Sequence, residues 1–174
     1  MYSNLKLLYF SATGTTAKVV KAIARELGDV TAEYDITLPS DRVDDIKFVE
    51  DDLLIIGVPV YAGRVPNFLV EYFNKISGDN TKAIFIVVYG NRDYDDALLE
   101  LLDIFKEKSF VGIAGGAFIG EHSYTALVAN NRPDIIDLNI AASFGKTCKE
   151  KLDSANNFLN LKVKGNYPYK ERLP

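Results

Sequence analysis

The feature that most constrains the fold is Leu53–Val58, a run of six residues in which every residue except Gly57 is strongly apolar. A strand with one face in water alternates between apolar and polar residues. An unbroken apolar run therefore indicates a strand that is covered on both faces, as in the middle of a parallel sheet. Because parallel neighbours need crossover connections, we expect helices on both sides of that sheet.

Four further segments are expected to be strands, and amphipathic stretches separate them along the chain. The expected strands are Leu5–Phe10, Val30–Ile36, Ala83–Val88 and Phe110–Ile119. The other stretches place apolar residues at helical spacing, and each is expected to be a helix. The first is Ala17–Leu27, and the second follows Pro66 with the stripe Phe68, Leu69, Tyr72, Phe73 and Ile76. The third has the stripe Leu98, Leu101, Leu102 and Phe105, and the last follows Pro133 with the stripe Ile136, Ile140, Phe144 and Cys148. This alternation predicts an α/β fold with a five-stranded parallel sheet between two layers of helices.

Length and composition limit the class of protein. A chain of 174 residues is the size of one domain of about 100–200 residues, and we expect a domain over residues 1–155 followed by a polar arm or linker over residues 156–174. With one cysteine and one histidine, the chain alone cannot build a Cys/His zinc site or an iron–sulfur cluster. The net charge of −4 argues against binding to nucleic acid. The sequence shows no signal peptide and no membrane span, so we expect a cytoplasmic protein.

A loop rich in hydroxyl groups follows the first expected strand. This first loop consists of Ser11, Ala12, Thr13, Gly14, Thr15 and Thr16. It precedes a helix, whose first amides are unpaired and whose dipole places partial positive charge at that end. A phosphate bound there would accept hydrogen bonds from amides and hydroxyls without a cation. Helix capping is the alternative interpretation, although capping needs only one of the four hydroxyls. The loop lacks the residues of a Walker A or a dinucleotide-binding motif.

Two loops that combine glycine with tyrosine follow the third and fourth expected strands. The second loop consists of Pro59, Val60, Tyr61, Ala62, Gly63 and Arg64, and the third loop consists of Tyr89, Gly90, Asn91, Arg92, Asp93, Tyr94, Asp95 and Asp96. Ligands of parallel sheets bind beyond the carboxyl ends of the strands. Together the three loops suit a flat, phosphorylated aromatic ligand on which tyrosine rings stack. A simple turn and an Asp-rich helix start are the alternative interpretations of the second and the third loop.

These motifs resemble those of flavodoxins. The first loop matches the flavodoxin phosphate-loop pattern Thr/Ser-x-Thr-Gly-x-Thr, and the segments Tyr9–Thr16 and Val88–Arg92 are similar to the flavodoxin half of bacterial and archaeal flavodoxin–ferredoxin fusion proteins. The resemblance implies a flavodoxin-like three-layer sandwich with strand order 2-1-3-4-5, and noncovalent FMN at the carboxyl edge of the sheet. It also implies that the first loop wraps the phosphate, while Pro59–Arg64 and Gly90–Tyr94 flank the isoalloxazine ring.

The resemblance further implies partners and roles for single residues. Fusion relatives continue after a segment like Gly165–Tyr169 into a cysteine-rich ferredoxin module, whereas this sequence ends at Pro174, so a protein without that module and a shortened chain are both open alternatives. Redox partner proteins are expected, among them a ferredoxin or another iron–sulfur module. Flavodoxins often stack a Trp on the flavin, and since this chain has no Trp, Tyr61 or Tyr94 must serve or one face is open.

Two single residues complete the expectations. His122 follows the fifth expected strand, where a histidine lines the flavin in some related FMN quinone reductases, and an ordinary loop histidine is the alternative. Cys148 lies on the apolar side of the last expected helix and is expected to be a small buried apolar residue.

The resemblance implies an electron-transfer protein whose flavin cycles between oxidised, semiquinone and reduced states. A backbone carbonyl near Ala62–Gly63 would favour the semiquinone by accepting a hydrogen bond from flavin N5, and the acidic run Asp93–Asp96 would oppose negative charge near N1. The alternative is an FMN-dependent NAD(P)H or quinone reductase, which Arg64 or Arg92 would favour by stabilising the reduced anion. A redox-silent domain that binds another phosphate ligand is the third alternative.

Overall fold

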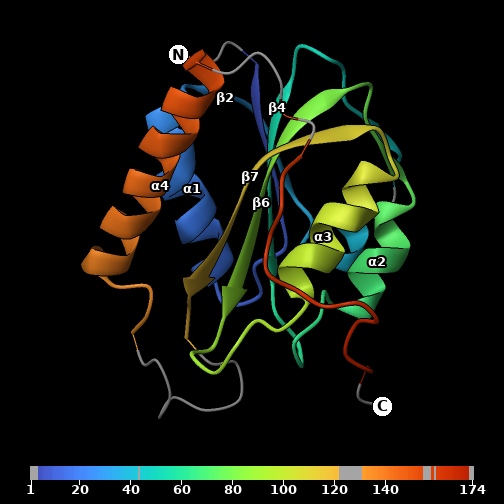
Figure 1. Ribbon diagram of the computed structural model, residues 1–174, viewed down its shortest axis with the longest axis vertical. Coiled ribbons are helices and arrows are strands. Elements are labelled where there is room, and N and C mark those ends of the chain that lie inside the picture. Colours follow the sequence, from blue (N-terminus) through green and yellow to red (C-terminus); the bar gives the residue numbers. More distant parts are fainter. Residues whose placement is uncertain (1–3, 43, 122–130, 155–157, 159, 173–174) are drawn as a thin grey trace.

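A five-stranded parallel sheet forms the middle layer of the protein (Figure 1). The computed structural model describes residues 4–42, 44–121, 131–154, 158 and 160–172. The strands of the sheet are β1 (Leu5–Tyr9), β2 (Val30–Asp35), β4 (Leu53–Pro59), β6 (Thr81–Tyr89) and β7 (Phe110–Ile119). Their spatial order is β2-β1-β4-β6-β7, which is 2-1-3-4-5 when the strands of this sheet are counted along the chain. The expected fold class and strand order are confirmed.

Helices cover both faces of the sheet (Figure 1). On one face lie α1 (Thr15–Leu27) and α4 (Ile135–Ser154), and on the other lie α2 (Asn67–Phe73) and α3 (Ala97–Lys106). β4 shows why both layers are needed. Its residues Leu53 and Ile55 pack in the core beneath α1, whereas Leu54 and Ile56 pack in the core beneath α2 and α3. Among the described residues, no helix has both the length and the apolar character that crossing a membrane requires.

The structure contains a second, small sheet that the sequence does not predict. In it β3 (Ile46–Lys47), which follows the 3₁₀ turn η1 (Pro39–Asp41), pairs in parallel with β5 (Ile76–Ser77). Ile76 was expected on the apolar stripe of the helix after Pro66, and that prediction is wrong, because α2 ends at Phe73 and Ile76 is buried as part of β5. A two-residue strand is too short to show strand periodicity, so spacing alone could not separate Ile76 from the helix.

The buried face of α4 also differs from the expected one. Ile136 and Ile140 were expected to lie with Cys148 on the apolar side, but their side chains are 64% and 56% exposed. The buried residues of the helix include Ala141, Gly145 and Cys148. A Cβ on Gly145 would lie 2.6 Å from the carbonyl oxygen of Ile23 in α1. The close approach of α4 to α1 therefore decides which face of α4 is buried. The prediction for Cys148 itself is confirmed, because the residue is only 2% exposed. This burial raises the pKa of its thiol to about 12.

Residues 160–172, named here the C-terminal arm, run back along α3 and β7 (Figure 1). Leu161 and Val163 of the arm pack against the core beneath α3. They have room because Gly112 and Gly115 of β7 carry no side chains. A Cβ on Gly112 would lie 2.9 Å from Leu161 Cδ2, and one on Gly115 would lie 2.8 Å from Val163 Cγ1. The glycines that interrupt the apolar pattern of β7 therefore accommodate the arm.

The substitution Gly57→Ala tests the close packing of α1 on β4. A Cβ on Gly57 would lie 2.4 Å from Val20 Cγ2 and 3.0 Å from Thr16 Cγ2, both in α1. We expect the change to lower the free energy of unfolding by about 1–3 kcal/mol, measured by urea denaturation followed by circular dichroism. In the Val20→Ala background, which removes the nearer methyl group, the same change should cost clearly less. An equal cost in both backgrounds would show that the strain does not arise from this contact.

Candidate functional site

The three loops predicted to form a site leave the sheet at one edge. β1, β4 and β6 are parallel neighbours, so their carboxyl ends lie side by side. Backbone hydrogen bonds then join the segments that follow them. Val60 N donates to Val88 O at 2.9 Å, and Asp96 N donates to Gly63 O at 3.1 Å. The structure therefore places the three loops at one edge and joins the second loop to the third.

The first loop presents the N-terminus of α1 to open space. Gly14 precedes the helix in a left-handed conformation (φ 79°) and supplies no side-chain cap. A Cβ on Gly14 would have nothing within 4 Å. Ser11 Oγ accepts a hydrogen bond from Ala17 N at 3.0 Å, and the hydroxyl oxygens of Thr13 and Thr15 lie 3.1 Å apart. Ser11 thus caps the helix, whereas Thr13 and Thr15 pair their hydroxyls at its start.

The second loop is a tight turn. Tyr61 N donates to Arg64 O and Arg64 N donates to Tyr61 O, both at 3.0 Å. Between them Ala62 and Gly63 adopt φ values of 51° and 85°, as in the two-residue turns that close β-hairpins. A Cβ on Gly63 would lie 2.2 Å from Asp95 Oδ2, so glycine is required both by its conformation and by this close approach. The second loop therefore packs closely against the third. The side chain of Tyr61, at the start of the turn, is exposed.

The third loop places two tyrosines together. The ring centroids of Tyr89 and Tyr94 lie 5.4 Å apart with an interplanar angle of 57°. Nζ of Lys164, in the C-terminal arm, lies 4.7 Å from the centroid of the Tyr94 ring. Asn91 adopts a positive φ of 62°, which turns the backbone sharply after β6. Tyr94 is therefore held between β6 and the arm.

The guanidinium of Arg64 is buried and engages α3. Its Nε and Nη2 donate to the two carboxylate oxygens of Glu100, each at 2.8 Å, and this pairing raises the pKa of Arg64. Its Cζ lies 4.7 Å from the centroid of the Tyr169 ring in the arm. Arg64 was expected as one of two arginines that could place a positive charge near flavin N1. In the structure its guanidinium is instead paired with the carboxylate of Glu100. Glu100 was not predicted as a site residue, and its only signal in the sequence is a charge inside the apolar stripe of α3.

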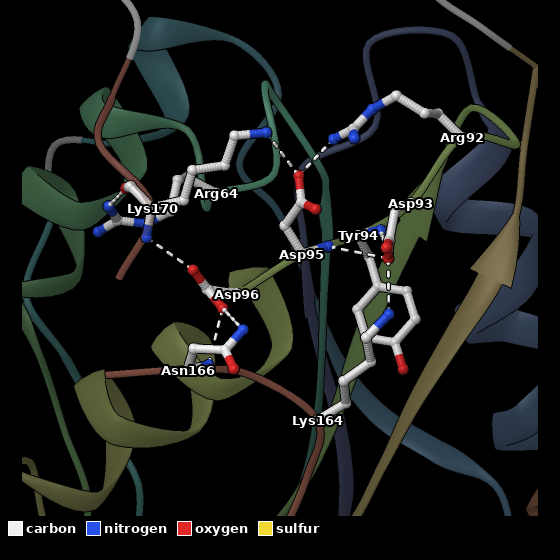
Figure 2. Close-up of polar contacts among 9 residues, drawn as sticks. All are labelled: Arg64, Arg92, Asp93, Tyr94, Asp95, Asp96, Lys164, Asn166 and Lys170. Carbon is white, nitrogen blue, oxygen red and sulfur yellow. Dashed lines mark hydrogen bonds and ion pairs between the residues drawn. The ribbon is translucent and has the colours of Figure 1, made fainter. Parts of the chain in front are cut away.

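The acidic run of the third loop is paired with cations (Figure 2). Lys164 Nζ donates to Asp93 Oδ1 at 2.9 Å, and this bond, with backbone N–H donors, holds the pKa of Asp93 at about 2. Lys170 Nζ donates to Asp95 Oδ2 at 2.8 Å, and Arg92 donates to the same oxygen. These two cations lower the pKa of Asp95. Both carboxylates are therefore ionised and matched by positive charge at neutral pH.

Asp96 is held differently, by the backbone of the arm (Figure 2). Its carboxylate accepts hydrogen bonds from Lys170 N at 2.6 Å, Asn166 N at 2.8 Å and Asn166 Nδ2 at 3.2 Å. Burial opposes ionisation of Asp96, but these bonds outweigh it and lower the pKa. Lys164, Asn166 and Lys170 were not predicted as site residues, because the polar segment 156–174 indicated only an arm or a linker.

The other predicted residues lie on the expected loops. Ala12 and Asn91 are exposed, Pro59, Val60 and Gly90 are half-buried, and Thr16 is buried with its methyl group toward Gly57. His122 lies outside the described residues. The geometry therefore combines an open helix N-terminus, a rigid turn with an exposed tyrosine, and a loop whose carboxylates are paired.

Comparisons with known proteins agree with this architecture. A family model described as a flavodoxin domain matches residues 6–127. Oxidised flavodoxin 1 from Bacillus cereus has 16% identity and a TM-score of 0.56, over 88% of this chain and 100% of that one. A flavodoxin from the domain Archaea has 12% identity and a TM-score of 0.54, over 86% of this chain and 99% of that one. The Flv1 flavodiiron core from Synechocystis sp. has 17% identity and a TM-score of 0.57, over 87% of this chain and 36% of that one.

A comparison with curated proteins finds no match. The identities to the solved structures are low, so these structures support the fold alone. The family model is different in kind, because it matches the sequence itself over more than half of the chain and includes all three loops. The chain belongs to the flavodoxin-domain family.

Proposed function

We propose that this protein binds FMN noncovalently and carries single electrons between redox partner proteins. The observation that carries the proposal is the open N-terminus of α1 at the carboxyl edge of the sheet, where Gly14 leaves space above the first turn. Unpaired amides and the helix dipole favour a phosphate at such a place. The hydroxyls of Thr13 and Thr15, which share a hydrogen bond in the structure, would turn toward a bound phosphate as two further donors. The residues of the first loop therefore fit the phosphate of FMN.

The second and third loops fit the ring of FMN. The exposed side chain of Tyr61 comes from a turn that backbone hydrogen bonds hold rigid, and Tyr94 is packed against Tyr89. We assign Tyr61 and Tyr94 to the faces of the ring, and the backbone of Pro59–Arg64 and Gly90–Tyr94 to its edge. When bound, FMN supplies the electron chemistry. The loops orient it and set the charges around it.

The charges at this edge support a carrier rather than an NAD(P)H or quinone reductase. A reductase that moves electron pairs gains from a positive charge that stabilises the reduced anion. Arg64 is paired with Glu100, and Arg92 is paired with Asp95. Neither arginine of the two loops is left without a carboxylate. A carrier exchanges electrons with a partner protein, and a ferredoxin or another iron–sulfur module is the kind of partner that we propose.

Replacing Thr13 and Thr15 by valine tests the phosphate site. Each hydroxyl lost from a charged ligand should weaken FMN binding by about tenfold or more, measured by calorimetric titration of flavin-free protein. Riboflavin, which lacks the phosphate, should lose far less affinity. Thr147→Val, on the exposed side of α4, is the matched control. Unchanged FMN affinity in the double variant would refute this assignment.

Tyr61→Phe and Tyr94→Phe test the ring contacts while keeping the shape of each side chain. Tyrosine beside a flavin quenches its fluorescence by electron donation, and phenylalanine is a much poorer donor. Bound flavin should therefore become brighter in each variant, measured as emission per bound flavin. Tyr34→Phe, in the edge strand β2, should leave the emission unchanged. If all three variants behave alike, Tyr61 and Tyr94 do not contact the flavin.

Stepwise chemical reduction of the flavin-loaded protein tests the carrier proposal. We expect two one-electron steps that are resolved in visible absorption spectra, and slow turnover when NADH or NADPH is supplied with a quinone. The physical reason is that paired arginines leave the reduced anion without strong stabilisation. A single two-electron step together with fast nicotinamide-driven quinone reduction would favour the reductase instead.

A further inference from the structure

We propose that the C-terminal arm is part of the flavin site, and that Asp96 is the positioning residue through which the arm holds the second and third loops in their binding arrangement. The proposal rests on the proposed function for its ligand. Its structural content stands on contacts of the described residues alone. These contacts form two buried junctions and one exposed set of ion pairs.

The first junction is Asp96, which is 3% exposed. Its amide donates to Gly63 O at 3.1 Å, so its backbone contacts the tip of the second loop. Its carboxylate accepts three hydrogen bonds from Asn166 and Lys170, two of them from backbone N–H groups (Figure 2). Backbone donors fix the register of the arm against the carboxylate. One residue of the third loop therefore joins the second loop to the arm.

The second junction is Glu100, one turn further along α3 and 4% exposed. Besides the two bonds from Arg64, its carboxylate accepts a hydrogen bond from Val65 N at 2.9 Å and one from Arg172 Nη2 at 2.5 Å. Arg172 Nη1 in turn donates to Val65 O at 2.6 Å, and Arg64 donates to the carbonyl oxygen of Lys170. The end of the second loop is thus enclosed between α3 and the arm.

The arm is anchored independently of these junctions. Leu161 and Val163 occupy the space that the glycines of β7 leave, and Gly165 fits against Leu99, where a Cβ would lie 2.4 Å from Leu99 Cβ. Tyr169 Oη donates to Asp103 Oδ2 at 2.5 Å, and Tyr167 Oη donates to the same oxygen. Because the arm is fixed along its whole length, it can serve as a rigid support for the loops.

Asp103 supplies a matched control for Asp96. Both are aspartates of the α3 region that accept hydrogen bonds from the arm. Only Asp96 also contacts the second loop, through its bond with Gly63 O. Asp96→Asn and Asp103→Asn remove the same charge from two arm contacts, one next to the second loop and one away from it. Asp96 is buried and Asp103 is half-buried, so the second loop itself is followed in both variants.

We expect Asp96→Asn to weaken binding of FMN and of riboflavin in parallel, each by about tenfold or more, because the affected loops face the ring and not the phosphate. Asp103→Asn should change either affinity by less than about threefold. The visible circular dichroism of bound FMN should change in the first variant only. Wild-type affinity in Asp96→Asn, or an equal loss in both variants, would overturn the proposal.

Amide hydrogen exchange of the flavin-free protein gives a readout that needs no ligand. The amides of Tyr61 and Arg64, which close the second loop, should exchange faster in Asp96→Asn and at the wild-type rate in Asp103→Asn. If the wild-type protein bound neither FMN nor riboflavin, the proposed function would fail, while this comparison would still decide the role of the arm. Equal exchange in the two variants would reject that role.

A milder variant covers the case in which Asp96→Asn does not fold. Asn166 is exposed, so Asn166→Ala keeps the backbone donor and removes only the weaker side-chain bond to Asp96. Loss of this side-chain bond should reduce the affinity for FMN and for riboflavin by about threefold, in the same direction as Asp96→Asn. In that case an unchanged affinity for both flavins in Asn166→Ala would contradict the proposal.

Discussion

Complete burial of the central strand is the constraint on which the rest of the structure depends. Leu53–Val58 of β4 are all buried, so helices must cover both faces and the backbone polar groups must pair within the sheet. Parallel pairing meets that need, but it requires a crossover connection after each strand. As a consequence the five strands of this sheet end at the same edge. The segments that follow β1, β4 and β6 meet there whatever their sequences, and their side chains decide what the edge can bind.

Two buried carboxylates, Asp96 and Glu100, then join that edge to the end of the chain. Burying a carboxylate is costly unless hydrogen bonds replace its water. The donors to Asp96 come from the arm, as Asn166 does, whereas those to Glu100 come from Arg64 of the second loop, from the following Val65 and from Arg172 of the arm. The burial of Glu100 is therefore fully compensated only when both segments are in place. This shared requirement makes the loop and the arm structurally dependent on each other.

The pairing also changes the electrical character of the third loop. In the sequence Asp93–Asp96 is a negative run in a loop expected to flank the flavin ring, where it would oppose negative charge near N1. In the structure Lys164 and Lys170 form ion pairs with Asp93 and Asp95, and these cations lower the pKa of both carboxyl groups. The carboxylates act mainly as acceptors that hold the arm. The field at this edge thus depends on a segment far away in the sequence.

The sequence by itself determined the main strands, the helices and the three loops, because each corresponds to a local pattern of apolar spacing or of glycine with hydroxyls before a helix. Only the tertiary structure decided which residues meet. It selected Gly145 over Ile136 and Ile140 for the buried face of α4, because the size of the facing residue sets how closely two helices approach. It also paired Arg64 with Glu100, 36 residues away, and Asp96 with Asn166, 70 residues away. A local pattern contains no information about such partners, since the burial and the donors that select them exist only after the segments have packed.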